Sequence, residues 1–333
     1  MRREILAIFV TIIATFPMLW FMIGSTIYTQ VAEARADCWN HSKFNTPDDF
    51  RVRHGGENLD DVNVSQYFIH GYENISFDLK DEPITIAGWM KETSSDAPWV
   101  IVLHGIRSCK SNHEVLLPAG MLVKAGINVL MIDMRDHGNS TWEDGRVSAG
   151  QKEWRDVSGA FHWLNETQGV SKDKIGLFGA SMGAATVAIT FAQEEEIQAV
   201  WLDSVFSDLG SMLKEELENQ GFPTALSGSA IFAGKVIAGE DLMAHRPLAA
   251  AENLGDRHMF VTHGNQDARI GVHHGQLMYD SANGENVEYW FVDSEFEFLD
   301  NGEPAIENHV SVMLTHMEEY EAKLVAFFQG ALA

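Results

Sequence analysis

Short apolar runs alternate with stretches of helical length from about residue 71 to the end of the chain. The runs WVIVLHG (99–105) and INVLMID (127–133) are apolar along almost their whole length, which is typical of strands buried on both faces of a parallel sheet. The same kind of run returns in KIGLFG, IQAVWLDS, HMFVTHG and VEYWFVDS. This alternation predicts an α/β fold, with a mostly parallel sheet and helices on both of its faces. We expect the helices near residues 113–126, 151–166, 182–194, 271–281 and 309–329.

Three segments depart from this regular order. YENISFDL and ITIAGWMK, joined by the turn residues KDEP, predict an antiparallel pair of strands at the start of the domain. Residues 207–256 are apolar and rich in Ala and Gly, and we expect a small helical cap between two core strands. Residues 31–70 are polar and aperiodic, and we expect a tether with one short helix at Pro47. The domain itself is therefore placed at residues 71–333.

The N-terminal segment carries no charged side chain from Ile5 to Tyr28. As a helix this segment would reach roughly 36 Å, more than the roughly 30 Å hydrocarbon core of a membrane. Arg2 and Arg3 precede it and acidic residues follow it, a distribution that keeps the N-terminus in the cytoplasm. We therefore predict one transmembrane helix, a membrane anchor at residues 1–30, with the domain exported to the periplasm or the cell surface.

A cleaved signal peptide is the alternative for this segment. Ala34-Arg35-Ala36 resembles a small-x-small cleavage site, but the apolar run is longer than the usual core of about 7–15 residues. Either interpretation exports the domain. Cys38 and Cys109 are the two cysteines of the chain, and in an oxidising compartment they can pair, although their spacing does not establish it.

The chain is strongly acidic, with 48 Asp and Glu against 23 Lys and Arg and a formal net charge of −25. This charge repels nucleic acid and anionic lipid headgroups, so we expect no nucleic-acid partner. Acidity of this kind is more typical of a solubility or salt-tolerance device than of a binding surface.

The sequence GASMG (179–183) places a serine between two glycines. It follows the strand-like KIGLFG and precedes the helix-like AATVAITFA, which is the strand–turn–helix setting of a nucleophile elbow. Such a turn holds its serine in a sparsely populated backbone conformation, so the residues two positions to either side must be small. We interpret Ser181 as a catalytic nucleophile rather than as an incidental serine in the glycine-rich start of a helix.

A serine hydroxyl needs a histidine to accept its proton and an acid to orient that histidine. In sheets of this type the expected chain order is serine, acid, histidine, each in a loop after a strand. Asp267 follows HMFVTHG and His309 stands directly before the last predicted helix, so both fit that order after Ser181. Asp203, at the end of IQAVWLDS, is the competing acid, and we interpret His316 as structural or solvated.

Acyl transfer also needs two backbone N–H donors that face the developing oxyanion. We expect one from Met182, directly after the nucleophile, and the other from Ile106 in the loop after WVIVLHG. Arg107 and Lys110 follow in that loop. They can bind an anionic group of a substrate, but on so acidic a protein we expect them to be solvated.

Two further clusters invite a functional interpretation. DMRDHGNS (133–140) contains aspartates and a histidine, but it precedes the serine, and we interpret it as a polar network that stabilises a loop. His263, His273 and His274 lie near Asp267, but no H-x-x-x-H pair with a helical carboxylate accompanies them. We therefore expect neither a metal nor another cofactor.

The motifs together resemble the α/β-hydrolase superfamily over about residues 71–330. The residues that carry the resemblance are VLHGIRS, IDMRDHGNS, GLFGASMGAA, LDSVFSDL, HGNQD and NHV, in the family's order. Within the superfamily the chain is most similar to the serine-aminopeptidase-like and membrane-anchored hydrolase-domain group. The resemblance implies Ser181 as nucleophile, Asp267 as acid, His309 as base, and Ile106 and Met182 as oxyanion donors. The loop EFEFLDNGEPAIE departs from the family's pattern, because it is longer and more acidic than the usual approach to the histidine.

Esterases, lipases, peptidases, thioesterases and acyltransferases share this scaffold, so the resemblance does not fix the substrate. We predict a membrane-anchored, exported serine hydrolase that cleaves carboxylic esters through an acyl-enzyme, with a small-molecule or lipid-like acyl ester as its substrate. A serine peptidase or aminopeptidase and a thioesterase are the enzymatic alternatives. A non-catalytic binding module is the alternative of another class, although such a module would be expected to lack a triad member or an elbow glycine.

Overall fold

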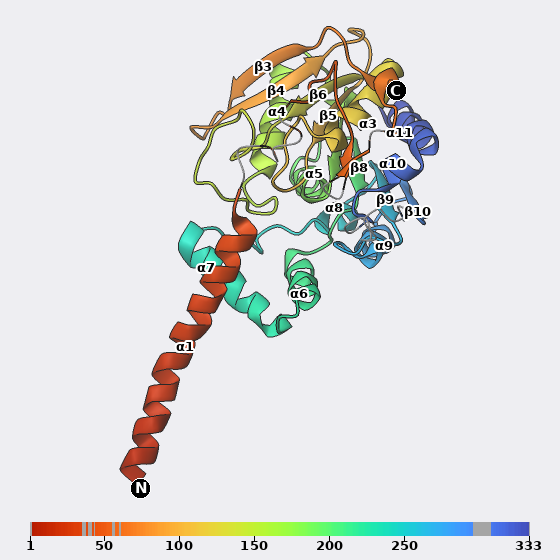
Figure 1. The fold of residues 1–333 in the computed structure, drawn as a ribbon. Helices are drawn as coiled ribbons and strands as arrows, with labels where there is room; N and C mark the ends of the chain where they lie inside the picture. Colours follow the sequence, from red (N-terminus) through yellow and green to blue (C-terminus); the bar gives the residue numbers. More distant parts are fainter. Residues whose placement is uncertain are drawn as a thin grey trace.

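The computed structural model describes residues 2–34, 38, 42, 44–54, 57–59, 61–295 and 308–332, without the side chains of residues 2–14, 54, 57 and 58. An eight-stranded sheet forms its centre, in the order β10-β9-β8-β7-β5-β6-β4-β3 (Figure 1). The pairs β3–β4 and β4–β6 are antiparallel and the other pairs are parallel, so the predicted mostly parallel sheet and its leading antiparallel pair are confirmed. The strands are β3 Glu73–Asp78, β4 Thr85–Lys91, β5 Trp99–Leu103, β6 Asn128–Ile132, β7 Ile175–Ala180, β8 Ala199–Asp203, β9 His258–Gly264 and β10 Val287–Val292.

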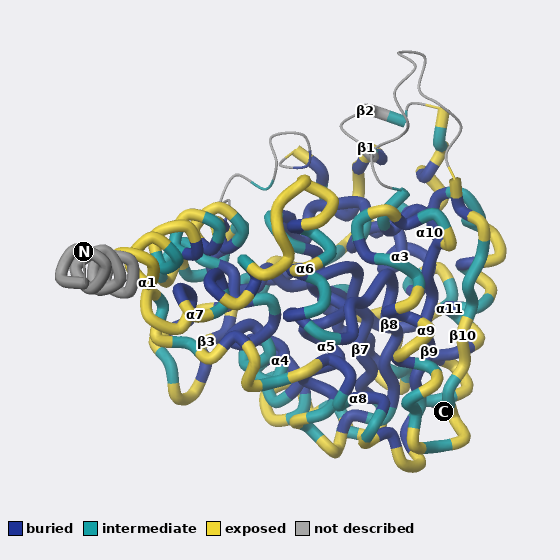
Figure 2. Tube along the Cα trace, turned by 90° about the horizontal axis from the view of Figure 1, so that it is seen from below, coloured by how far each residue is buried: buried dark blue, intermediate teal, exposed yellow. Residues whose placement is uncertain are grey.

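The central strands are apolar along their length because helices cover both faces of the sheet. In β5, Ile101 and Leu103 enter one core while Val100 and Val102 enter the other, and all four are fully buried. Helices α4, α5 and α9 contribute to the first core, and α3, α10 and α11 contribute to the second. Figure 2 shows the resulting block of buried residues around β7, β8 and α5. These helices are α3 His113–Lys124, α4 Trp154–Glu166, α5 Met182–Gln193, α9 Val272–Asp280, α10 Val312–Thr315 and α11 Met317–Ala331.

The N-terminal helix α1, Arg2–Ala32, projects from the domain, and its C-terminal part lies beside α7 (Figure 1). The sequence predicts a membrane span over much of this helix. Among the helical residues whose side chains are described, no stretch is long and apolar enough to cross a membrane. The first part of the predicted span, up to residue 14, lies outside those side chains.

The segment predicted as a cap, 207–256, contains three α-helices between β8 and β9. They are α6 Leu209–Asn219, α7 Ser227–Ala238 and α8 Ala249–Glu252. Helix α8 packs on α5, whereas α6 and α7 lie away from the sheet, toward α1 (Figure 1). A small separate core joins α6, α7 and α1, and it contains Leu213, Leu217, Ala230, Ile27 and Val31. The cap therefore shares its core with the N-terminal helix.

The segment expected to be a tether, 31–70, packs on the domain in much of its described part. Phe50, Val52 and Tyr67 are buried in the core that also contains α3 and α11. A Cβ atom placed on Gly120 of α3 would lie 2.2 Å from the carbonyl oxygen of Tyr67, so the contact is close. These apolar residues follow no helical or strand period, which is why their burial was not expected from the sequence.

Short elements replace the helix expected in this segment. The prediction at Pro47 is wrong, because residues 46–49 form a turn in which the backbones of Thr46 and Asp49 bond each other. Two short antiparallel strands, β1 Arg53–His54 and β2 Glu57–Asn58, and a short 3₁₀ helix, η1 Ser65–Tyr67, follow. Cys38 and Cys109 form a disulfide with a Cα–Cα distance of 5.3 Å, which fastens the segment after α1 to the loop after β5.

Candidate active site

Ser181 lies between β7 and α5 in a backbone conformation that few residues adopt, with φ 57° and ψ −124°. A Cβ on Gly179 would lie 2.3 Å from the carbonyl oxygen of Gly183. A Cβ on Gly183 would lie 2.5 Å from the carbonyl oxygen of His104. Close backbone contacts therefore require both glycines, which is the steric demand that the GASMG motif predicts.

Ser181, His309 and Asp267 form one chain of hydrogen bonds. His309 Nε2 lies 2.7 Å from Ser181 Oγ, and His309 Nδ1 lies 2.8 Å from Asp267 Oδ2. The other carboxylate oxygen of Asp267 accepts the backbone N–H groups of Arg269, at 3.0 Å, and Ile270, at 2.9 Å. The turn after β9 thus orients the carboxylate, and the structure brings together the three residues that the chain order predicted.

The charges within this chain favour proton transfer from the serine. Burial opposes the ionisation of Asp267, but His309 and His263 outweigh it and hold the pKa of Asp267 well below its ordinary range. Burial also disfavours the charged form of His309, yet the carboxylate of Asp267 prevails and raises the pKa of His309. A histidine held in this way is oriented and basic enough to accept the hydroxyl proton of Ser181.

Asp203, the competing acid, has other partners. Its Oδ2 accepts the hydroxyl of Tyr320 at 2.7 Å, and its Oδ1 accepts the hydroxyl of Ser204 at 3.0 Å. Burial raises the pKa of Asp203 to about 6, and the two hydroxyl donors only partly offset it. The geometry therefore gives the acid position beside His309 to Asp267.

Both predicted oxyanion donors lie next to Ser181. Met182 is the first residue of α5, and the N–H groups of a helix's first turn have no acceptor within the helix. Ile106 lies in the loop after β5, where Arg107 adopts a φ of 56°. A Cβ on Gly105 would lie 3.3 Å from the Cβ of Ser181, so this loop passes directly beside the serine.

Glu114 is a neighbour of the site that sequence reasoning missed. Its Oε2 would lie 3.3 Å from a Cβ on Gly105. Burial raises the pKa of Glu114, while the charge of His309 and the N–H of Gly105 oppose that rise. An acid in the first turn of α3, after the capping residue Asn112, is an ordinary helix-start pattern, so nothing in the sequence distinguished it.

The two cations of the loop after β5 are not solvated as expected. Lys110 is only 4% exposed and forms an ion pair with the fully buried Asp133, and its ammonium also donates to Asn139 at 2.9 Å. Asp133 further accepts the backbone N–H groups of Lys110 and Asn139, which confirms the polar network predicted for residues 133–140. Arg107 donates to three carbonyl oxygens at the end of α1.

The other histidines that the sequence analysis singled out have local partners. His263 Nε2 lies 2.7 Å from the carbonyl oxygen of Ile270, and His316 Nδ1 lies 2.9 Å from the hydroxyl of Thr315. His273 and His274 meet Glu215 of the cap, with ligand atoms within 4.8 Å of one another. This group has the donor set of a metal site, but it lies apart from the hydrogen bonds of Ser181.

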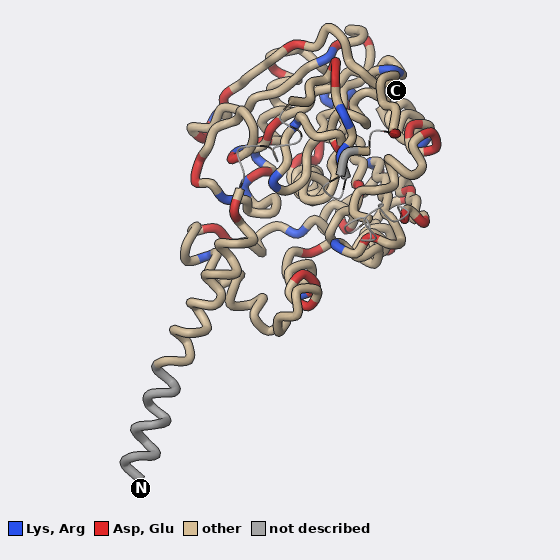
Figure 3. Tube along the Cα trace, in the orientation of Figure 1, with Lys and Arg blue, Asp and Glu red and all other residues tan. Residues whose placement is uncertain are grey.

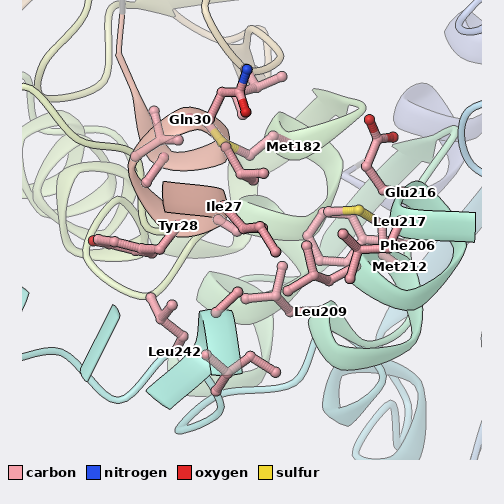
Figure 4. Close-up of a pocket in the computed structure, with 18 of the residues that line it drawn as sticks. Ile27, Tyr28, Gln30, Met182, Phe206, Leu209, Met212, Glu216, Leu217 and Leu242 are labelled. Carbon is pink, nitrogen blue, oxygen red and sulfur yellow. The ribbon is translucent and has the colours of Figure 1, made fainter. Parts of the chain in front are cut away.

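A cavity of about 490 Å³ adjoins Ser181, Ile106 and Met182. Figure 4 shows its apolar lining, which includes Leu209, Met212 and Leu217 of α6 and Ile27 and Tyr28 of α1. The apolar cap predicted from the sequence accounts for the α6 wall. The α1 wall was not expected, because an apolar helix has the same sequence pattern in lipid and in a protein cavity.

The chain is similar to known proteins in sequence and in fold. The family model described as the prolyl oligopeptidase family matches residues 117–333. An uncharacterised 31.7 kDa protein of Escherichia coli is 28% identical over 149 residues, which are 44% of this chain and 50% of that protein. The chain thus spans about half the length of this relative. The thiohydrolase AneE of Aspergillus aculeatus is 27% identical over 117 residues, which are 34% of this chain and 36% of that protein.

Solved structures extend the likeness of fold to most of the domain. The esterase Pf2001 of Pyrococcus furiosus superposes with a TM-score of 0.61 at 23% identity, over 79% of this chain and 93% of that one. Its likeness concerns the fold, while the family model covers the segment that holds Ser181, Asp267 and His309. The chain belongs to the prolyl oligopeptidase family, within the α/β-hydrolase superfamily.

Proposed function

We propose that this protein is a serine hydrolase that cleaves carboxylic esters through an acyl-enzyme intermediate. The observation that carries the proposal is the hydrogen-bonded chain of Ser181, His309 and Asp267 beside an apolar cavity. The three hydrogen-bonded residues supply an activated nucleophile. The cavity supplies a water-poor site for the apolar part of a substrate.

Each half of the reaction uses the same groups. Ser181 Oγ attacks the ester carbonyl carbon while its proton passes to His309 Nε2, and the carbonyl oxygen becomes an oxyanion held by the N–H groups of Ile106 and Met182. Collapse of this intermediate breaks the bond to the alcohol, which leaves with the proton from His309. His309 then takes a proton from water, whose oxygen attacks the acyl carbon of the acyl-enzyme. The bond from that carbon to Ser181 Oγ breaks, Ser181 Oγ takes the proton back from His309, and a carboxylic acid is released.

The test combines labelling with turnover. We expect a fluorophosphonate probe to label the purified full-length chain and p-nitrophenyl esters to be hydrolysed. Both signals should be lost in Ser181→Ala while circular dichroism stays that of the folded protein. Turnover that persists in Ser181→Ala would overturn the proposal, and a folded wild type that neither labels nor hydrolyses any ester would favour a non-catalytic binding module.

Two other leaving groups have specific support. The family name favours a peptidase or aminopeptidase, and the likeness to a thiohydrolase favours a thioester substrate. Aminoacyl p-nitroanilides and acyl thioesters assayed beside esters of the same acyl group distinguish the three. Ester cleavage is proposed first because the cavity is apolar, whereas a peptide substrate needs polar partners for its backbone groups.

We also propose that the domain is exported and that its N-terminal helix holds it at a membrane. Residues 15–32 of α1 carry no Lys, Arg, Asp or Glu (Figure 3), and Phe16, Met18 and Leu19 are each more than half exposed. Contiguous apolar side chains of this kind are costly in water and favourable against lipid. The disulfide Cys38–Cys109 suits an oxidising compartment.

Fractionation of cells that express the full-length chain tests the location. The protein should stay in the membrane pellet after an alkaline carbonate wash. Its Cys38–Cys109 peptides should migrate as one disulfide-linked species without reductant. Release by the wash, with an N-terminus that begins after Ala36, would instead support the signal peptide.

A further inference from the structure

The C-terminal part of α1 contributes to the same cavity as Ser181. Ile23, Ile27 and Val31 of this helix line the cavity. Ile27 and Val31 also pack against residues of α6 and α7, and Figure 4 shows Ile27 in the lining. These three positions recur every four residues and so lie along one face of the helix. A helix that the sequence explains as an anchor thus presents an apolar face to the acyl-transfer site.

The structure fixes the end of α1 to the catalytic domain. Arg107, the residue after the predicted oxyanion donor, donates hydrogen bonds to the carbonyl oxygens of Gln30 and Val31 and to that of Glu33. The carbonyl oxygen of Ala32 accepts the backbone N–H of Val147 at 2.7 Å. These bonds satisfy carbonyl groups that a helix end leaves without intrahelical partners. Together with the disulfide from Cys38, they hold the helix end in one position beside the loop of Ile106.

The neighbouring face of α1 is fitted closely to α7. A Cβ on Gly24 would lie 2.3 Å from the carbonyl oxygen of Ser229 in α7. A Cβ on Gly234 would lie 2.9 Å from the ring of Tyr28. Glycines at both contacts allow the two helices to approach closely. The wall that α1 forms is therefore a packed part of the domain rather than a helix that happens to lie nearby.

We infer that residues 23–31 of α1 form one wall of a binding site for the acyl chain of the substrate, and that the substrate is a fatty acyl ester. The inference rests on the proposed function. The cavity volume of about 490 Å³ lies within the usual range of roughly 300–1,000 Å³ for ligand sites, and its lining between α1, α6 and α7 is mainly aliphatic. An unbranched hydrocarbon chain buries its whole surface in such a site without leaving polar groups unpaired.

Binding of this kind gives a measurable dependence on chain length. Each methylene group that enters the cavity should raise kcat/KM by about fourfold until the cavity is full. Cleavage of the chain after Ala36 would also remove this wall, since the break separates α1 from the domain that it completes. The inference therefore requires that the active enzyme keep its N-terminal helix.

The experiment compares p-nitrophenyl laurate with p-nitrophenyl acetate, using the full-length chain in one nonionic detergent. Ile27→Trp fills the cavity from the α1 side, and the ratio of laurate to acetate kcat/KM should fall at least tenfold. Met22→Trp is the matched control, because Met22 is 56% exposed on the same helix and lies outside the cavity lining. Its ratio should stay within twofold of the wild type.

A second variant covers the case in which Ile27→Trp does not fold. Ile27→Ala removes contacts with the chain, and the ratio should fall about threefold to tenfold through a higher KM for laurate. A ratio that stays within twofold of the wild type in the folded Ile27 variants would overturn the inference. Failure of the proposed function gives a different result, since the wild type would then hydrolyse neither ester and would resist fluorophosphonate.

Discussion

Two regions meet at Ser181, and they are built in different ways. The hydrogen-bonded chain comes from loops next to β7, β9 and α10, and it rests on a sheet whose central strands are fully buried on both faces. The cavity wall comes from α1, α6 and α7, which are joined by a small core around Leu213, Leu217 and Ala230 and also reach the main core through residues such as Tyr28 and Leu209. The continuous core of the sheet supports the first region, while contacts between the helices and the bonds from Arg107 to the end of α1 support the second.

This difference separates chemistry from substrate selection. A strand that is hydrogen-bonded to a neighbour on each side holds its end in one position. The reacting atoms at such strand ends therefore keep one geometry, which acyl transfer requires. We expect side chains in a wall made largely of helices to tolerate change with little effect on those strand ends. Changes in the first region should therefore reduce the hydrolysis of all esters alike, and changes in the second should alter the preference for chain length.

The largest effect is expected from Asp267→Asn. The amide cannot hold His309 in the tautomer that accepts the proton of Ser181, so kcat should fall by about 10⁴-fold. The fall in kcat should be equal for acetate and laurate esters, because Asp267 bonds to His309 and is not among the residues that line the cavity for the acyl chain. Steady-state assays with both esters measure it, and a loss confined to laurate would contradict the separation of the two regions.

Asp203→Asn is the matched control, since Asp203 is the competing acid of the sequence and is also buried. The exchange weakens the bond from Tyr320 and should cost about 1–2 kcal/mol in the free energy of unfolding. Its kcat should stay within a few-fold of the wild type. If this variant lost as much activity as Asp267→Asn, Asp203 would be the functional acid.

A smaller uniform loss is expected from Gly183→Ala. The new Cβ would lie 2.5 Å from the carbonyl oxygen of His104, so the elbow or the loop of Ile106 must shift. Loss of one aligned oxyanion donor lowers kcat by about 10²-fold or more, again for both chain lengths. Gly330→Ala in α11 is the control, because its Cβ would meet no atom within 4 Å. A change in the laurate-to-acetate ratio would mean that the elbow also shapes the cavity.

The two regions also differ in how far the sequence predicted them. Continuous apolar runs such as Val100–Leu103 are typical of strands buried on both faces. The elbow motif requires small residues at positions 179 and 183. The order of Ser181, Asp267 and His309 then followed from the topology of the sheet. Local patterns were sufficient here because each residue's role depends on the strand next to it.

The cavity wall could not be predicted in this way. Ile27 belongs to an apolar helix whose pattern is the same whether it faces lipid, the cap or a substrate. The burial of Lys110 likewise depends on Asp133, a partner 23 residues away on another strand end. Such contacts are decided by tertiary packing between segments, which no local period records. The sequence also singled out the long loop before His309. Residues 296–307 of that loop lie outside the part of the chain that the structure describes.

Gly24→Ala should change selectivity more than chemistry. Its Cβ would lie 2.3 Å from the carbonyl oxygen of Ser229, so α1 must move away from α7 and the cavity wall must open. We expect the ratio of kcat/KM for laurate to that for acetate to fall about threefold to tenfold, because part of the acyl chain loses contact with α1. Gly228→Ala, one residue from Ser229 on α7, is the control, since its Cβ would meet no atom within 4 Å. An equal loss on both esters would show that α1 also supports the reacting residues.

The smallest effect concerns pH, and it tests whether both chain lengths depend on the same base. His309 must be neutral to accept the proton of Ser181, and Asp267 raises its pKa above the ordinary value of about 6.5. Activity should therefore rise with pH through a midpoint above about 6.5, with the same midpoint for acetate and laurate. The residual activity of Asp267→Asn should have its midpoint at lower pH, because the neutral amide no longer stabilises the imidazolium.

The pKa of Asp203, raised by burial to about 6, lies close enough to require its own control. Asp203 bonds to Tyr320 and Ser204 rather than to His309, so Asp203→Asn should leave the midpoint of kcat/KM in place. If the midpoint moved in Asp203→Asn and stayed in Asp267→Asn, the titrating group would be Asp203. If the two esters had different midpoints, a group in the cavity wall would be taking part in the chemistry. The two regions would then not have separate roles.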